Sequence, residues 1–162
     1  MDGLGTIFDK VQREVKIASH LSKIFGANDD VTSRAAYLAK ADLLTQVVYE
    51  FTELQGLVGS YYAKIFGESD EVALAIKEQY FPIGEKGELP TSLESAIVAM
   101  SNKLDTLMAI FSIGKLPSGN KDPFALRRAA AGVLKIAMEH KLDFDIKAFF
   151  ESMQTEYKQF DL

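Results

Sequence analysis

Apolar residues recur at steps of three and four along most of the chain, which is the spacing of a helix with one buried face. The first long run extends from Leu4 to Phe25 and stops at Gly26, a residue type that commonly ends helices. A second long run extends from Leu93 to Phe111. Strand-like alternation and tight-hairpin dipeptides are absent from the sequence. The pattern therefore predicts an all-α protein built as a multi-helix bundle.

Shorter stretches with the same period account for the rest of the chain. They predict helices within residues 30–51, 55–67, 69–81, 123–141 and 144–160, which makes about six or seven helices in all. Ser69 or Asp70 is expected to begin the third of these, and Thr91 with Glu94 predicts a capping box before the second long run. No internal repeat or low-complexity segment divides the sequence. We expect residues 1–162 to form a single helical domain.

Composition and charge narrow the class of protein. The chain has 162 residues, of which 48% are apolar, and this is enough for a sizeable core. The formal net charge of −5 argues against a protein that binds nucleic acid with its whole surface, so any contact with a polyanion must come from a local patch. Cysteine is absent, which excludes disulfides and thiol chemistry. No apolar run approaches the roughly 18 residues of a membrane span, and no signal-peptide core precedes the first helix, so we expect a cytoplasmic protein without membrane contact.

A local basic patch lies between residues 113 and 128, where a loop with glycine and proline leads into a helix. Its basic residues are Lys115, Lys121, Arg127 and Arg128. Asp122 is a suitable N-cap residue, and Pro123 suits the first helical position. We interpret the four basic residues as candidates for contact with RNA phosphates, which would position an RNA without reading its sequence. In the alternative interpretation the patch is structural: Asp122 caps its own helix, and one of the two arginines turns inward to a buried carboxylate such as Asp105.

Three stretches of the sequence together resemble one protein family. They are SRAAYLAKADLLTQVVYEFTELQGLVGSYYAKIFGE at residues 33–68, VAMSNKLDTLMAIFSIG at 98–114 and KLPSGNKDPFALRRAAAGVLKI at 115–136. These stretches are similar to the β subunit of the bacterial two-subunit glycyl-tRNA synthetase, and GLGTIFDKVQR near the start is similar to the preceding segment of that subunit. The most specific part is the string P-x-G-x-K-D-P-F-x-L-R-R in its place after the KLDTL helix.

The resemblance implies that this chain is an internal fragment of a longer β subunit and thus part of a glycine-tRNA ligase. That enzyme joins glycine to tRNA(Gly) with ATP, and its adenylate-forming catalytic domain belongs to the α subunit. ATP and Mg²⁺ would therefore serve the whole enzyme through the α subunit, and we expect no cofactor and no catalytic residue in this fragment. The implied partners are the α subunit, tRNA(Gly) and the remaining domains of the β subunit.

The resemblance also implies a helical bundle similar to the HD-type phosphohydrolase fold, which holds a metal ion with histidines, a His-Asp pair and a distant aspartate. The pair corresponds to Ala41 and Asp42, and the distant aspartate to Asp105, so the histidine of the pair is missing. His20 and His140, the two histidines of the chain, lie in no ligand pattern. Two carboxylates without imidazole partners make a poor site for a transition metal, although weak Mg²⁺ binding stays open.

We interpret Asp42 and Asp105 as degenerate positions of that site, with no metal assigned to them. Each interrupts an apolar helical face, and a buried carboxylate must find hydrogen bonds or a cation. The candidate partners are Arg34, Lys40, Lys103, Arg127 and Arg128.

Three hypotheses for the function follow. The first is a non-catalytic module that supports the charging of tRNA with glycine by helping to bind or position the tRNA. The second is a purely structural spacer, between β-subunit domains or against the α subunit, that never contacts RNA. The third is a residual metal-dependent phosphohydrolase, against which the missing histidines argue.

Overall fold

The computed structural model describes residues 4–118 and 121–157, and no β-strand occurs within these ranges. The α-helices are α1 (Ile7–Phe25), α2 (Asp29–Leu38), α3 (Gln46–Glu50), α4 (Leu57–Ile65), α5 (Asp70–Glu78), α6 (Leu93–Ser112), α7 (Leu126–Glu139) and α8 (Ile146–Met153). Three short 3-10 helices are η1 (Ala41–Leu44), η2 (Thr52–Leu54) and η3 (Gln154–Glu156). The all-α class predicted from the sequence is confirmed, while the similarity to the HD-type fold stays a prediction.

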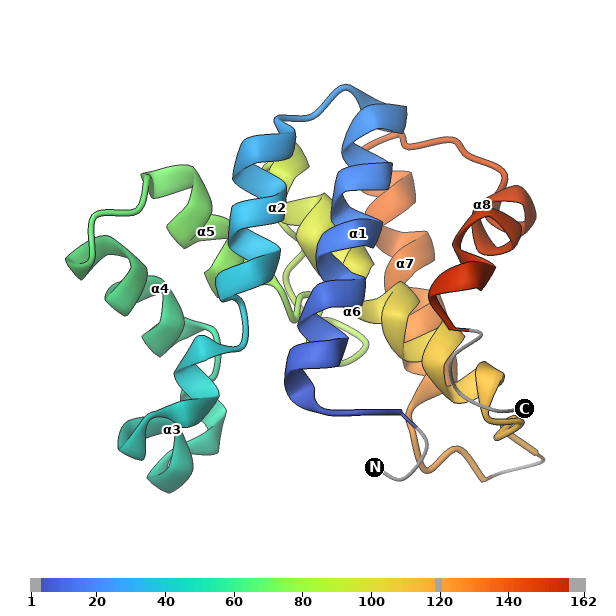
Figure 1. The fold of residues 1–162 in the computed structure, drawn as a ribbon, viewed down its shortest axis with the longest axis horizontal. Helices are drawn as coiled ribbons and strands as arrows, with labels where there is room; N and C mark the ends of the chain where they lie inside the picture. Colours follow the sequence, from blue (N-terminus) through green and yellow to red (C-terminus); the bar gives the residue numbers. More distant parts are fainter. Residues whose placement is uncertain (1–3, 119–120, 158–162) are drawn as a thin grey trace.

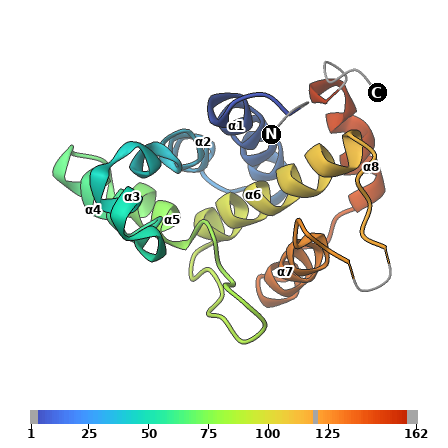
Figure 2. The same cartoon turned by 90° about the horizontal axis from the view of Figure 1, so that it is seen from below.

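Helix α6 is the centre of the bundle. It packs against α1, α2, α5 and α7, and it runs through the middle of the molecule in Figure 2 with α1 and α2 on one side and α7 on the other. Helices α3, α4 and α5 lie toward one end of the bundle and α8 lies toward the other (Figure 1). A helix with apolar residues around most of its circumference is stable only when it is covered on several sides. The long apolar run predicted from the sequence is therefore α6, the helix that connects the two ends of the bundle.

Two main hydrophobic cores share this central helix. The larger core combines buried side chains of α1, α6, α7 and α8, among them Ile17, Leu21, Met100, Ile136 and Phe149. The second core joins α2, α4 and α5 through Ala35, Ala63 and Ile76, with Val98 from α6. Small side chains on α2 and α5 allow these short helices to approach one another closely, since alanine adds little bulk at the contact. The α2–α5 end is thus packed mostly by small residues.

Several helix boundaries follow local capping. Gly26 ends α1 with φ 71°, and Ser69 begins α5 by accepting a hydrogen bond from the N–H of Val72, as the sequence predicts. The predicted capping box of Thr91 is wrong. Ser92 caps α6 instead, because the N–H and hydroxyl of Thr91 both donate to the carboxylate of Glu78 on α5.

Within residues 30–51, where the sequence predicts helix, the structure has α2, η1 and α3. The break follows Ala39, whose carbonyl accepts a hydrogen bond of 2.6 Å from the side-chain amide of Gln79. Asp42 then turns its carboxylate toward the beginning of α4, and Thr45 caps α3. Tertiary partners thus replace the helical hydrogen bonds that the periodic pattern suggested. This division accounts for the larger number of helices in the described ranges.

Candidate functional site

The basic loop-to-helix junction has a different geometry from the one predicted. Helix α7 begins at Leu126, after Ala125 in the left-handed conformation (φ 56°), so Pro123 lies outside the helix and Asp122 is not its N-cap residue. The carboxylate of Asp122 nevertheless accepts hydrogen bonds from the N–H groups of Leu126 (2.8 Å) and Arg127 (3.0 Å). These bonds lower the pKa of Asp122, the bond from Arg127 being the larger cause. An anionic ligand would therefore compete with Asp122 for these N–H groups.

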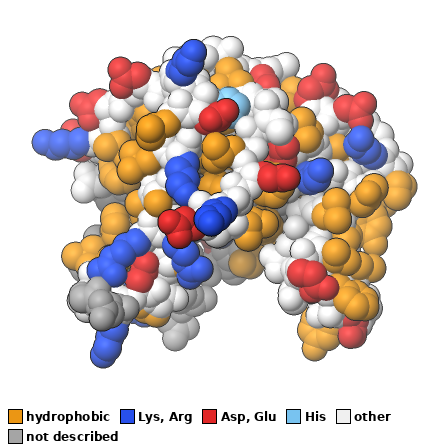
Figure 3. Space-filling model, turned by 180° about the vertical axis from the view of Figure 1, so that it is seen from behind, with side chains coloured by type: hydrophobic (Ala, Val, Ile, Leu, Met, Phe, Trp, Pro, Cys, Tyr) orange, Lys and Arg blue, Asp and Glu red, His pale blue; other side chains and the backbone are white. Residues whose placement is uncertain are grey.

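All four basic residues of the junction are exposed. Ser118 and Lys121 exchange two backbone hydrogen bonds of 3.1 and 2.9 Å, which closes the loop. The ammonium of Lys115 lies 5.5 Å from the ring centroid of Phe124. A hollow of about 400 Å³ is bordered by Lys115, Ser118, Lys121 and Phe124. In Figure 3, basic side chains gather at the lower left, which is the end of the molecule that carries this loop.

The prediction that an arginine of α7 holds Asp105 is wrong. Arg127 and Arg128 both lie on the exposed side of α7. The cations that hold Asp105 come from α1: Lys10 Nζ lies 2.8 Å from Oδ2 and Arg13 Nε lies 2.6 Å from Oδ1. The hydroxyl of Tyr157 also donates to Oδ1, at 2.9 Å.

This cluster around Asp105 is buried. The Asp105 residue is 1% exposed and Arg13 is 4% exposed. Burial alone would raise the pKa of the Asp105 carboxyl, but Lys10 and Arg13 together outweigh burial and hold that pKa below its usual value. Burial also raises the pKa of Tyr157, and the neighbouring Asp105 carboxylate adds to this rise. The tyrosine hydroxyl thus stays a hydrogen-bond donor to a charged carboxylate.

A second buried carboxylate extends the cluster, and the sequence analysis missed it. Glu14 lies 2.9 Å from the ammonium of Lys10 and 3.7 Å from that of Lys40. The Lys40 ammonium also lies 4.4 Å from the ring centroid of Tyr80. A signal for Glu14 was present in the sequence, because this residue lies on the same helical face as Val11, three residues before it.

Asp42 has partners of another kind. Its Oδ2 accepts hydrogen bonds from the backbone N–H groups of Gly56 (2.7 Å) and Gly59 (3.3 Å), at the beginning of α4. A carboxylate at this position is favoured by the unpaired N–H groups of a helix start. Gly59 leaves room for it, since a Cβ there would lie 3.0 Å from Oδ2.

The other predicted partners have different contacts. Arg34 pairs with Glu68, and the ammonium of Lys103 donates to the backbone carbonyls of Tyr80 (3.2 Å) and Phe81 (2.6 Å). Burial, with a smaller effect from the nearby Lys40 ammonium, lowers the pKa of Lys103 to about 8.

The residues present do not fit the metal ion of an HD-type site. Asp42 and Asp105 share no hydrogen-bond partner within the described part of the chain, and Asp105 is already neutralised by two cations. His20 packs edge-on against Phe149, and a ring nitrogen of His140 lies 2.8 Å from the carbonyl of Pro90. Over residues 4–118 and 121–157, no three His, Cys, Asp or Glu side chains gather as a metal site would require. We derive no metal-dependent chemistry from this arrangement.

No helix within the described residues is long and apolar enough to cross a membrane. The C-terminal segment packs against α1: Phe149 of α8 contacts His20, and Tyr157, which follows η3, contacts Arg13. Residues 158–160 of the last predicted helix lie outside the described residues.

Comparison with known proteins assigns the chain to a family. A family model described as the glycyl-tRNA synthetase beta subunit matches residues 1–161. The chain is 48% identical to the glycine–tRNA ligase beta subunit of Helicobacter pylori (strain Shi470), over 100% of the chain and 25% of that relative. It is 50% identical to the same subunit of Pseudomonas aeruginosa (strain LESB58), over 95% of the chain and 22% of the relative. The chain thus spans about a quarter of the length of these curated relatives, and it belongs to the glycyl-tRNA synthetase beta subunit family.

Proposed function

We propose that this chain is a non-catalytic helical module of a glycine–tRNA ligase that helps to position tRNA(Gly) through the basic loop-to-helix junction. The enzyme would act in the cytoplasm, with ATP and Mg²⁺ bound by the α subunit. The observation that carries the proposal is the exposure of Lys115 and Lys121 at one hollow, with the exposed Arg127 and Arg128 following in the first turn of α7, on a chain whose net charge is −5. Contacts of this kind add affinity for any RNA backbone and depend strongly on salt.

The geometry supports side-chain contacts rather than binding at the start of α7. Asp122 already accepts hydrogen bonds from the first N–H groups of that helix. A phosphate would therefore meet the ammonium groups of Lys115 and Lys121 at the hollow, or the guanidinium groups in the first turn of α7. Lysine acts there as a point charge, and arginine offers a planar pair of donors.

The test is tRNA binding across a salt series. A variant with Lys115→Glu, Lys121→Glu and Arg128→Glu is compared with a control of equal charge change, Lys23→Glu, Lys77→Glu and Lys147→Glu, whose lysines are exposed elsewhere on the surface. We expect the junction variant to bind tRNA far more weakly, with a slope of log K against log salt smaller by about two to three. In the whole enzyme, the same variant should lower tRNA charging and leave glycine-dependent adenylate formation unchanged. Equal binding by the two variants would refute the proposal.

The spacer function is the second candidate. It is favoured by the large apolar side chains exposed at the other end of the bundle, among them Leu44 and Phe66. The same salt series separates the two functions, because a spacer would not bind tRNA at low salt.

A further inference from the structure

One segment of the molecule exposes an unusual number of large apolar side chains. We call residues 41–66, which comprise η1, α3, η2 and α4, the apolar arm. Its exposed apolar side chains are Leu44, Val47, Tyr49, Phe51, Leu57, Tyr61, Ile65 and Phe66. Leu44 is 91% exposed and Phe66 is 81% exposed. The hydrophobic side chains at the right of Figure 3 belong to this end of the molecule. A contiguous apolar surface of this kind typically marks an interaction site.

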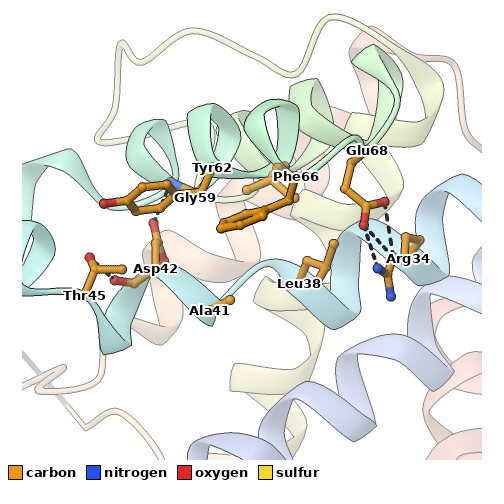
Figure 4. Close-up of a pocket in the computed structure, with 11 residues that line it drawn as sticks. Arg34, Leu38, Ala41, Asp42, Thr45, Gly59, Tyr62, Phe66 and Glu68 are labelled. Atoms are coloured by element: carbon orange, nitrogen blue, oxygen red, sulfur yellow. Dashed lines mark hydrogen bonds and ion pairs between the residues drawn. The ribbon is translucent and has the colours of Figure 1, made fainter.

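A cavity lies where the arm meets α2, between α4 on one side and α2 with η1 on the other (Figure 4). Its volume is about 530 Å³. Apolar groups form most of its wall, including Leu38, Ile76 and Phe66. At one end the guanidinium of Arg34 binds the carboxylate of Glu68, with Nε–O distances of 3.1 and 3.2 Å.

At the other end of the cavity, a buried carboxylate oxygen has no hydrogen-bond donor among the described residues. Asp42 lines this end and is 1% exposed. Its Oδ2 is satisfied by Gly56 and Gly59, but its Oδ1 is buried and accepts no hydrogen bond from the residues that the structure describes. A buried carboxylate oxygen requires a donor, and a cation is the strongest donor for it. A positively charged side chain with an apolar stem would therefore fit both the wall of the cavity and this oxygen.

The surrounding charge points to the same kind of partner. Residues 29–71 carry eight acidic and three basic side chains, a formal charge of −5, whereas residues 113–128 carry four basic side chains and one acidic side chain. A phosphate backbone would be repelled from the arm, and a basic segment would be attracted to it. The arm and the basic junction lie at opposite ends of the molecule in Figure 3.

We propose that the apolar arm is a docking surface for another part of the same β subunit, which inserts one lysine or arginine side chain into the cavity. The aliphatic stem lies against Leu38, Phe66 and Ile76, and the charged head donates to Asp42 Oδ1. The rest of the subunit is the source because the relatives are about four times as long as this chain, and covalent linkage gives such a segment a high effective concentration. Interfaces between domains of one chain have this mixed apolar and charged character.

The test uses the whole β subunit with its α subunit. Benzoylphenylalanine is placed at position 66 or 44, and, as a control, at position 138, where Met138 is 79% exposed on α7. We expect photo-cross-links from positions 66 and 44 to a segment of the same polypeptide that contains a lysine or arginine within a few residues, and no cross-link to that segment from position 138. Cross-links to the α subunit, to a second β subunit or to tRNA, or no cross-link at all, would overturn the proposal.

Two variants of the whole subunit provide a second readout. Phe66→Asp changes an exposed side chain, so the fold of the domain is not at risk, and Asp42→Asn removes the charge in the cavity. We expect each to speed amide hydrogen exchange in the docked segment by about tenfold or more, which corresponds to a lost anchor contact. Met138→Asp should leave this exchange unchanged. Unchanged exchange in the Phe66→Asp variant would refute the docking, whatever the junction variants show for tRNA binding.

Discussion

The buried cluster around Asp105 yields the sharpest test of how this fold is stabilised. The substitution Asp105→Asn keeps the size of the side chain and one acceptor oxygen but removes the charge. Lys10 would then keep Glu14, at 2.9 Å, as its carboxylate partner, and the buried Arg13 would lose its ion pair with Asp105. The perturbation thus takes from a buried guanidinium the carboxylate charge that its Nε contacts at 2.6 Å.

The expected magnitude follows from this geometry. Removing one partner of a buried ion pair costs about 3–5 kcal/mol, and the retained acceptor places Asp105→Asn at about 3 kcal/mol. For a domain of this size, the corresponding fall in the melting temperature is about 6–12 °C. A single-domain protein has about 5–15 kcal/mol of unfolding free energy, so the loss is a large share of it.

The assay is urea unfolding of the 162-residue chain, followed by circular dichroism. The control is Asp143→Asn, an exposed carboxylate, which should change the free energy of unfolding by less than about 0.5 kcal/mol. A double-mutant cycle of Asp105→Asn with Arg13→Met should give a coupling of about 1–3 kcal/mol. A loss below about 1 kcal/mol, or additive effects in the cycle, would show that the cluster is not a source of stability.

The pH dependence of unfolding gives an independent check on the same carboxyl. The folded-state pKa of Asp105 is lowered, so its contribution is fully present above the unfolded aspartate pKa of about 4 and is lost as the pH falls through the lower, folded-state value. The Asp105→Asn variant should therefore lose less stability on acidification below about pH 4 than the unchanged chain. Parallel acid profiles would contradict the assignment.

Three further predictions concern other helix contacts. The ammonium of Lys103, bound by the carbonyls of Tyr80 and Phe81, should titrate near pH 8 when followed by its ¹³Cε chemical shift. Between about pH 8 and 10.5 the unfolded state binds more protons than the folded state, so the free energy of unfolding should rise with pH. The Lys103→Met variant should show a flatter rise. Gly132→Ala should destabilise the chain by about 1–3 kcal/mol in urea unfolding, because the new Cβ would lie 2.6 Å from the Lys103 side chain. This loss is expected although alanine has the better helix propensity, and a stabilised variant would contradict this packing. Asp122→Ala should cost about 1 kcal/mol by removing two hydrogen bonds to the start of α7, and an unchanged midpoint of unfolding would show that this carboxylate does not support the helix.

The helical class and the long helices could be predicted from the sequence because helix period is a local property. The apolar residues of α1 and α6 repeat at helical spacing, and Gly26 and Ser69 mark boundaries through backbone geometry and capping that involve only nearby residues. The basic character of residues 113–128 was also evident, since the exposure of lysine and arginine is the usual outcome for these residue types.

Only the tertiary structure decided the partners of the buried charges. Asp105 is bound by Arg13, 92 residues earlier in the chain, and Asp42 is bound by the N–H groups of Gly56 and Gly59. A carboxylate in an apolar helical stripe predicts that a partner exists, because a buried carboxylate without one is costly. The packing of the helices determines which cation or N–H group that partner is.

The same limit applies to the apolar arm and to the choice of the residue that caps α6. The pattern of residues 41–66 indicated helices with apolar faces, yet whether such a face is buried depends on which element lies over it. Likewise, Thr91 binds Glu78 on a neighbouring helix, so Ser92 caps α6 instead. The periodic pattern of the sequence thus determined which segments form helices. Long-range packing determined which hydrogen-bond partner each polar group has and which apolar faces are covered, because the energies of these contacts depend on distances that local sequence does not specify.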